Sequence, residues 1–147
     1  QDISCGAMEV FPEALAEEFL RVARQLRRET QRRIAPLGLN LHQSRALRVI
    51  AGAGPLRPSE LAEHLGIVAR SATDAVAGLV AGGFVVRDTD PADRRAHLLA
   101  ISPEGSRALA EVDRIRTEVG AELFGSLGAE DRATLAALLA RLGGGAP

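Results

Sequence analysis

The chain has 147 residues, a formal net charge of −1 and a single cysteine. This length suits one domain that can bury a core without disulfides or a structural metal. The sequence contains no apolar run as long as a membrane span and no signal peptide, so we expect a cytoplasmic protein. A near-neutral charge argues mildly against nucleic-acid binding, because the neutralisation of phosphates requires a basic surface.

The first seven residues precede Met8, the only methionine in the chain. We interpret residues 1–7 as a remnant of expression and expect the native chain to begin at Met8. Cys5 lies in this segment, so the native protein would have no thiol for redox sensing. The alternative is a native terminus that carries an inert thiol.

A long helix is predicted from about residue 12 to 35. Its apolar residues recur at helical spacing on one stripe: Leu15, Phe19, Val22 and Leu26. The other face carries six arginines: Arg21, Arg24, Arg27, Arg28, Arg32 and Arg33. This run is either a solvated face or a surface that contacts phosphate or a partner.

Three shorter helices follow. Asn40 is a plausible N-cap for a helix over residues 41–51. A helix over 58–65 begins with Pro58, where the missing N–H costs nothing. After Gly66, a helix from about 69 to 81 ends at two glycines and turns its apolar stripe inward: Ala72, Val76 and Leu79.

Two strand-like segments, 84–87 and 97–101, flank the charged run 90–95. They predict a β-hairpin with a long, charged tip. Two helices joined by a tight turn and followed by a hairpin that carries arginines are typical of a winged helix-turn-helix. We therefore predict a mainly α fold with a small β-hairpin wing.

The C-terminal third predicts two more helices. Ser102 and Pro103 suit the start of the first, and residues 129–142 form the second, with four leucines facing inward: Leu135, Leu138, Leu139 and Leu142. Residues 143–147 are expected to form a flexible tail. These helices and the first are too apolar to stand exposed beside a winged-helix core, which predicts a second copy of the chain as partner.

Five segments closely resemble the MarR family of bacterial transcription regulators: 56–62, 65–67, 83–85, 90–95 and 101–105. The Asp-Pro-x-Asp-Arg-Arg wing followed by Ser-Pro-Glu-Gly is far more specific than a generic helix-turn-helix. The resemblance implies a single domain over 8–142, with a DNA-binding core at about 38–105 between dimerisation helices at 12–36 and 106–142. It also implies a homodimer on a pseudo-palindromic operator in double-stranded DNA, acting as a repressor that a small molecule releases.

The expected DNA-binding residues lie on the 69–81 helix and on the wing. Arg70, Ser71 and Thr73 can reach base edges or phosphates in the major groove. Arg94 and Arg95 can reach the minor groove or a phosphate. Asp93 is expected to support the wing by pairing with an arginine or with backbone N–H groups.

Asp74 and Gly78 depart from the family pattern. The family commonly has arginine or another long polar residue at both positions. An acid at position 74 would repel phosphate, or it could accept a hydrogen bond from a cytosine amino group. These departures affect which bases are read, not the fold.

An effector site is expected where the core meets the terminal helices. The family often binds phenolic or other aromatic carboxylates at that junction. Arg21, His42 and Arg45 are the candidate ligands for such an anion, because they lie on the first two helices. A surface or hydrogen-bonded structural role is the alternative for His42.

Nothing in the sequence indicates an enzyme, a metal site or a cofactor. The three histidines lie far apart, and no HExxH, CxxC, GxSxG or phosphate-binding loop occurs. A winged-helix module that binds protein instead of DNA stays open, because residues 57–107 hold six arginines against seven acidic residues. DNA binding therefore requires the arginines to face the duplex and the acids to turn away.

Overall fold

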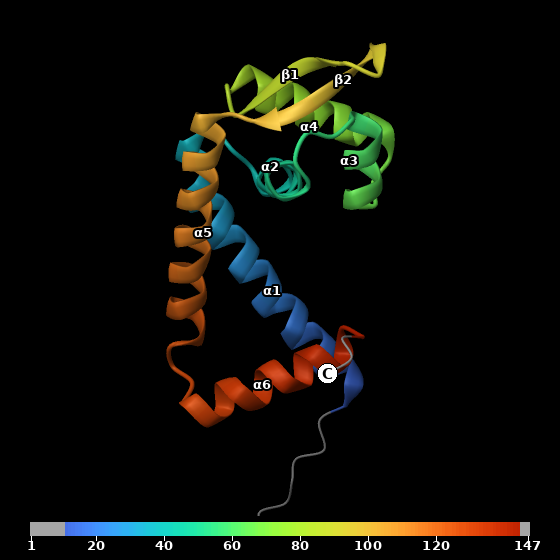
Figure 1. Ribbon diagram of the computed structural model, residues 1–147. Helices are drawn as coiled ribbons and strands as arrows, with labels where there is room; N and C mark the ends of the chain where they lie inside the picture. The colour runs from blue at the N-terminus through green and yellow to red at the C-terminus, as the bar shows by residue number, and fades with distance from the viewer. Residues whose placement is uncertain (1–10, 145–147) are drawn as a thin grey trace, which may run out of the picture.

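The computed structural model describes residues 11–144; the expected remnant at 1–7 and residues 145–147 of the expected tail lie outside this range. Figure 1 shows the elements in chain order. They are α1 (Pro12–Ile34), a short 3-10 helix (Ala35–Leu37), α2 (Leu41–Ala53), α3 (Pro58–Leu65), α4 (Ala69–Ala81), β1 (Val85–Asp90), β2 (Asp93–Ile101), α5 (Pro103–Phe124) and α6 (Ala129–Leu142). The predicted winged helix-turn-helix is confirmed.

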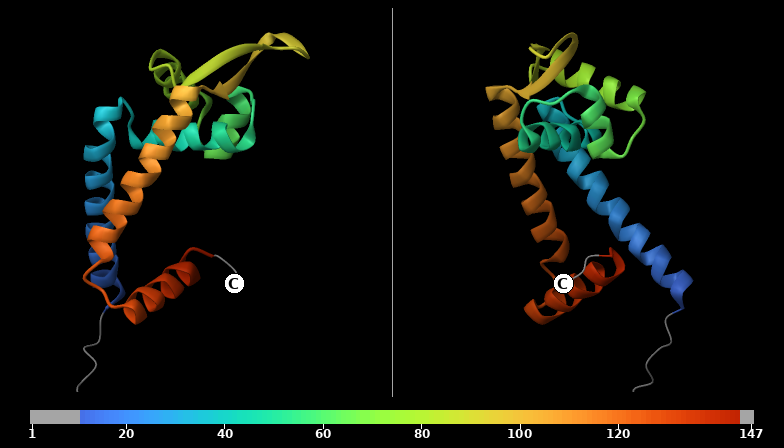
Figure 2. Two further views of the ribbon diagram at one scale, coloured as in Figure 1. Left: turned by 60° about the vertical axis from the view of Figure 1, so that its left-hand side comes forward. Right: turned by 45° about the vertical axis from the view of Figure 1, so that its right-hand side comes forward.

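The elements form two parts (Figures 1 and 2). The head comprises α2, α3, α4 and the β1–β2 hairpin. The arm comprises α1 and α5, which leave the head close together and diverge, and α6, which turns across their far end. Within residues 11–144, no helix is both long and apolar enough to cross a membrane.

Local hydrogen bonds explain where two of these helices begin. Asn40 accepts a hydrogen bond from the Gln43 amide at 2.8 Å, and the Gln43 side chain accepts one from the Asn40 amide at 3.0 Å. This reciprocal capping box satisfies two amides that the first turn of α2 leaves without a helical acceptor. Ser102 caps α5 by accepting from the Gly105 amide, and its hydroxyl donates to the Gly83 carbonyl at 2.5 Å. Both predicted N-caps are confirmed, and Ser102 also fastens α5 to the turn after α4.

The head buries its own core. The inward stripe predicted for α4 is fully buried, and it packs with residues of α2, α3 and the hairpin: Leu47, Ile50, Leu61, Val85 and Leu99. The core continues into the base of the arm, where the inner faces of α1 and α5 meet: Ile34, Val112, Ile115 and Val119. The head is thereby complete within one chain.

The hairpin differs from the prediction at its tip. β1 and β2 pair from Val85–Ile101 to Asp90–Asp93, so only Pro91 and Ala92 form the turn. The expected long, charged tip is therefore wrong. The strands extend into the polar run because backbone pairing needs no apolar side chain where the sheet surface is open to solvent.

The final helix also differs from the prediction. α6 has no buried residue, and its Leu138, Leu139 and Leu142 are 46%, 37% and 79% exposed. On α1, Leu15 and Phe19 of the predicted stripe are 58% and 54% exposed. The inward orientation predicted for the leucines of α6 is therefore wrong within one chain, because the arm carries them away from the head's core.

Candidate nucleic-acid interface

The outer face of α4 has different chemistry in its two halves. Arg70, Ser71, Thr73 and Asp74 are exposed in the first half, while the second half exposes only small residues. The Thr73 hydroxyl donates to the Ala69 carbonyl at 3.0 Å. Side chains that could reach a ligand are thus confined to the N-terminal half, the part of a recognition helix that meets base edges in helix-turn-helix proteins.

Gly78 allows α2 to approach α4 closely. A Cβ at this position would lie 2.3 Å from Nε2 of Gln43 on α2, far inside the van der Waals distance. Gln43 is in turn fixed by the capping box of α2. A long polar residue at position 78 would require Gln43 to move, which gives a packing reason for this departure from the family.

The carboxylates of the hairpin are used within the hairpin and its anchor. Asp93 accepts a hydrogen bond from the Arg95 amide at 3.0 Å, and Asp88 accepts one from the Thr89 amide at 2.8 Å. Asp93 was expected to pair with an arginine side chain or with backbone N–H groups, and in the structure its partner is a backbone N–H. Asp90 is buried and accepts from the Ala92 amide at 2.9 Å.

The arginines of the hairpin are exposed in contrast. Within residues 11–144, the guanidinium groups of Arg87, Arg94 and Arg95 have no ion pair or hydrogen bond. The same holds for Arg70 on α4. Each wing carboxylate engages a backbone amide while the guanidiniums stay available, which is how DNA binding could coexist with a nearly neutral charge count.

An ion pair between Arg57 and Asp90 was not predicted. Nε and Nη2 of Arg57 lie 2.8 and 2.6 Å from Oδ2 of Asp90. The hydrogen bond from the Ala92 amide, and then that from Arg57, hold the pKa of Asp90 below its ordinary value. The partners are separated by 33 residues, so no local pattern could reveal their pairing.

The candidate effector residues do not converge on one site. His42 and Arg45 line a hollow of about 420 Å³ between α2 and the α3–α4 pair, next to Ser71 and Asp74. Arg21 lies apart on the exposed face of α1, where its guanidinium is 2.7 Å from Glu18. The structure therefore separates Arg21 from the other two candidates.

A second hollow, of about 770 Å³, lies at the junction of α1, α2 and α5, and Arg45 lines it as well. Its charged residues are four arginines and one carboxylate: Arg27, Arg45, Arg48, Arg116 and Asp113. Arg48 pairs with Asp113 and lowers the pKa of that carboxyl. Arg27 belongs to the predicted arginine run, but Arg48 and Arg116 were not singled out by the sequence.

No metal site is evident in the described part of the chain. Among residues 11–144, no group of three or more His, Cys, Asp or Glu residues is arranged to hold a metal ion.

The geometry defines a class of protein. α3 and α4 are joined by a tight turn at Gly66, which adopts φ 63°, a left-handed conformation that glycine tolerates best. A two-stranded hairpin follows and leads directly into α5. This is a winged helix-turn-helix with long helices at both ends.

Comparisons with known proteins give the family. The MarR family model matches residues 37–96. A transcriptional regulatory protein for the hcr operon of Thauera aromatica is 35% identical over 96 residues, which are 65% of this chain and 58% of that protein. An uncharacterised HTH-type transcriptional regulator of Mycobacterium leprae is 32% identical over 113 residues, 77% of this chain and 76% of that protein. This chain belongs to the MarR family, whose members found here are named as transcriptional regulators and not as enzymes.

Solved structures agree with this assignment. The reduced form of MarR from E. coli is 26% identical, with a TM-score of 0.79 over 91% of this chain and 98% of that chain. A variant of the same protein complexed with operator DNA is 26% identical, with a TM-score of 0.72 over 87% of this chain and 92% of that chain.

Proposed function

We propose that this protein is a homodimeric DNA-binding transcriptional regulator that recognises a pseudo-palindromic operator and acts as a repressor released by a small ligand. The observation that carries the proposal is the division of charge on the head. The outer face of α4 and the wing present guanidiniums that have no ion pair within residues 11–144, and each wing carboxylate engages a backbone amide. The operator-bound E. coli relative gives independent support for DNA as the partner.

Each exposed group has a role in this proposal. Arg70 donates to a guanine edge in the major groove, and Ser71 and Thr73 meet neighbouring bases or phosphates. Arg94 enters the minor groove or contacts a phosphate, with Arg95 beside it. Asp93 holds the hairpin backbone, as its hydrogen bond to the Arg95 amide supports.

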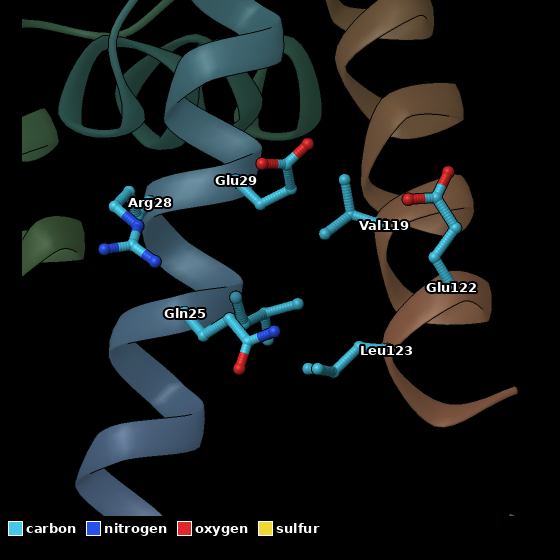
Figure 3. A pocket seen from close by; sticks show the side chains of 7 residues that line it. Gln25, Arg28, Glu29, Val119, Glu122 and Leu123 are labelled. Carbon is cyan, nitrogen blue, oxygen red and sulfur yellow. The ribbon is translucent and has the colours of Figure 1, made fainter. Parts of the chain in front are cut away.

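The arm supports a dimer. Its exposed apolar residues come from the start of α1 and from α6: Phe11, Leu15, Phe19, Leu20, Leu138, Leu139 and Leu142. Between α1 and α5 lies a hollow of about 380 Å³ (Figure 3), with an apolar floor of Leu26, Val119 and Leu123. Polar residues also line it and carry charges of both signs: Gln25, Arg28, Glu29 and Glu122. A lining that is part apolar and part polar suits a helix of a second copy.

The junction hollow is the proposed effector site. Arg27, Arg45 and Arg116 have no ion pair within residues 11–144, and Leu26, Leu41 and Phe124 supply apolar walls. An aromatic acid satisfies both features with its ring and its carboxylate. The hollow lies where the head meets the arm, so a ligand bound there can favour dimers with a different spacing between the two heads. Fewer dimers would then have the two recognition helices about 34–36 Å apart, the spacing that two half-sites require.

A salt series of gel shifts tests the function. The probe is the DNA upstream of the protein's own gene, and a scrambled duplex of equal length is the control. Specific binding should exceed non-specific binding at least about 10³-fold and weaken as salt rises. Equal, weak binding to both duplexes would favour the alternative, a winged-helix module that binds protein.

A further inference from the structure

The buried carboxylate of Asp90 joins the wing to the helix-turn-helix. Its Oδ2 accepts from Nε of Arg57 at 2.8 Å and lies 2.6 Å from Nη2, and its Oδ1 accepts from the Ala92 amide at 2.9 Å. Arg57 is the residue immediately before α3, and Ala92 belongs to the turn between the strands. One side chain thus connects the start of the helix-turn-helix, the end of β1 and the tip of the wing.

A second connection lies at the root of the hairpin. The Leu56 and Leu99 amides each donate to the other's carbonyl, at 3.2 and 2.8 Å. Arg57 is itself fixed, because its amide donates to the Glu60 carboxylate at 2.7 Å. Residues 56 and 57 therefore hold the hairpin at both its root and its tip, and the Arg57–Asp90 pair is the only ion pair in residues 11–144 that joins the wing to the helices.

We propose that Arg57 is a positioning residue for the wing: paired with Asp90, it sets where Arg94 and Arg95 lie relative to α4, and it does not itself contact DNA. The inference rests on the proposed DNA-binding function. Two of the Arg57 donor nitrogens are directed at one carboxylate oxygen, and the pair carries no net charge. It therefore adds little to phosphate neutralisation, which depends on unpaired cations.

The pairing also explains why an acidic residue, Asp90, lies near Arg94 and Arg95, which are expected to contact phosphates. The Asp90 side chain is 9% exposed, and without Arg57 it would be a buried charge with no cationic partner. The turn would then adjust to expose the carboxylate, and the arginines that follow it on β2 would move. Holding the hairpin in place before DNA arrives reduces the ordering that binding must otherwise supply.

A double-mutant cycle tests the role in binding. Affinities for an operator duplex are measured by fluorescence anisotropy for the full chain and for Arg57→Met, Arg94→Ala and the double variant. We expect Arg57→Met to weaken binding about fivefold in the wild-type background and less than twofold in the Arg94→Ala background, because its effect passes through the wing. If Arg57 contacted a phosphate itself, the two losses would multiply, and the proposal would be overturned.

A DNA-free measurement makes the test independent of the duplex. Amide hydrogen exchange at Ala92 should be faster in Arg57→Met than in wild type, and Arg57→Lys, which keeps one donor group, should restore part of the protection. Arg107→Met is the matched control, because its partner Glu104 lies on the same helix, and it should change neither exchange nor affinity. Unchanged exchange at Ala92 in Arg57→Met overturns the positioning role alone, whereas a wild-type protein that binds no duplex overturns the proposed function.

Discussion

The head buries its core apolar side chains within one chain, whereas the arm leaves several of its apolar side chains exposed. In the head, Leu47, Val76 and Leu99 are fully buried by elements of the same chain. In the arm, Phe19 and Leu142 are 54% and 79% exposed. One chain completes the core of the head but leaves apolar side chains of the arm exposed, so the arm's stability should depend on protein concentration while the head's should not.

The head and the arm also differ in how their arginines are paired. Several arm arginines form pairs with carboxylates of the arm, among them Arg33 with Glu29 and Glu122, and Arg114 with Glu111 and Glu118. Arg27 and Arg116, at the junction with the head, have no such pair within residues 11–144. The exposed arginines of α4 and the wing have no such partners within residues 11–144. A paired guanidinium must lose its carboxylate before it can neutralise a phosphate. The unpaired arginines on α4 and the wing lie together on one recognition surface, which favours the head for binding nucleic acid.

Removal of α6 should have the largest effect. A chain that ends at Gly128 should aggregate or become monomeric, because the exposed leucines of α6, which are proposed to pack against the second copy, are lost. Its operator affinity should fall about 100-fold, since the two heads no longer bind as one unit. Light scattering and anisotropy measure the two effects, and a chain that ends at Leu142 is the control. A well-behaved monomer for the full chain at micromolar concentration would contradict the comparison.

Arg94→Ala should alter the head without altering the arm. We expect operator affinity to fall about tenfold, evenly across sequences, and the salt dependence to flatten by about one unit of slope. The dimer should be retained by light scattering. An affinity unchanged at every salt concentration would remove the wing from the mechanism.

Arg45→Ala should uncouple head from arm. In wild type, an effective aromatic acid should raise the thermal midpoint and weaken operator binding severalfold; Arg45→Ala should blunt both effects. The variant His42→Ala tests which of the two hollows holds the ligand, because His42 lines only the hollow beside α4. If a broad panel yields a ligand that stabilises the protein yet leaves operator affinity untouched, the junction does not control DNA binding.

Thr73→Ala should distinguish the base contacts expected of α4 from the phosphate contacts expected of the wing. A contact to a base edge discriminates among bases whereas a contact to phosphate does not, so this variant should change the ranking of operator variants more than the mean affinity. Competition among duplexes that differ at single positions measures the ranking. A uniform loss over all duplexes would assign Thr73 to the phosphate backbone instead.

Acid should remove a small part of the arm's stability. Hydrogen bonds from Arg32 and Arg33 lower the pKa of Glu29 to about 2, below its value in an unfolded chain. A lowered folded-state pKa gives stability that is present above the unfolded value and lost as pH falls toward 2. The effect is small because the group is at the surface. Thermal midpoints from pH 5 to 2 should fall less steeply for Glu29→Gln, and identical slopes would show that Glu29 contributes nothing.

The amino-acid sequence by itself determined the helices, their caps and the family. Asn40 and Ser102 cap their helices through amides three residues away. The inward face of α4 follows from a period of 3.6 residues. The wing motif carried the resemblance because its residues lie next to one another. These features depend on neighbours in the chain, so a linear pattern contains them.

Only the tertiary structure decided which distant groups meet. It paired Arg57 with Asp90, separated Arg21 from His42 and Arg45, and brought arginines of three helices to one hollow. It also left the leucines of α6 uncovered, although their spacing suits burial. Each of these outcomes depends on the distance and angle between elements, which follow from how the whole core packs and not from the residues on either side.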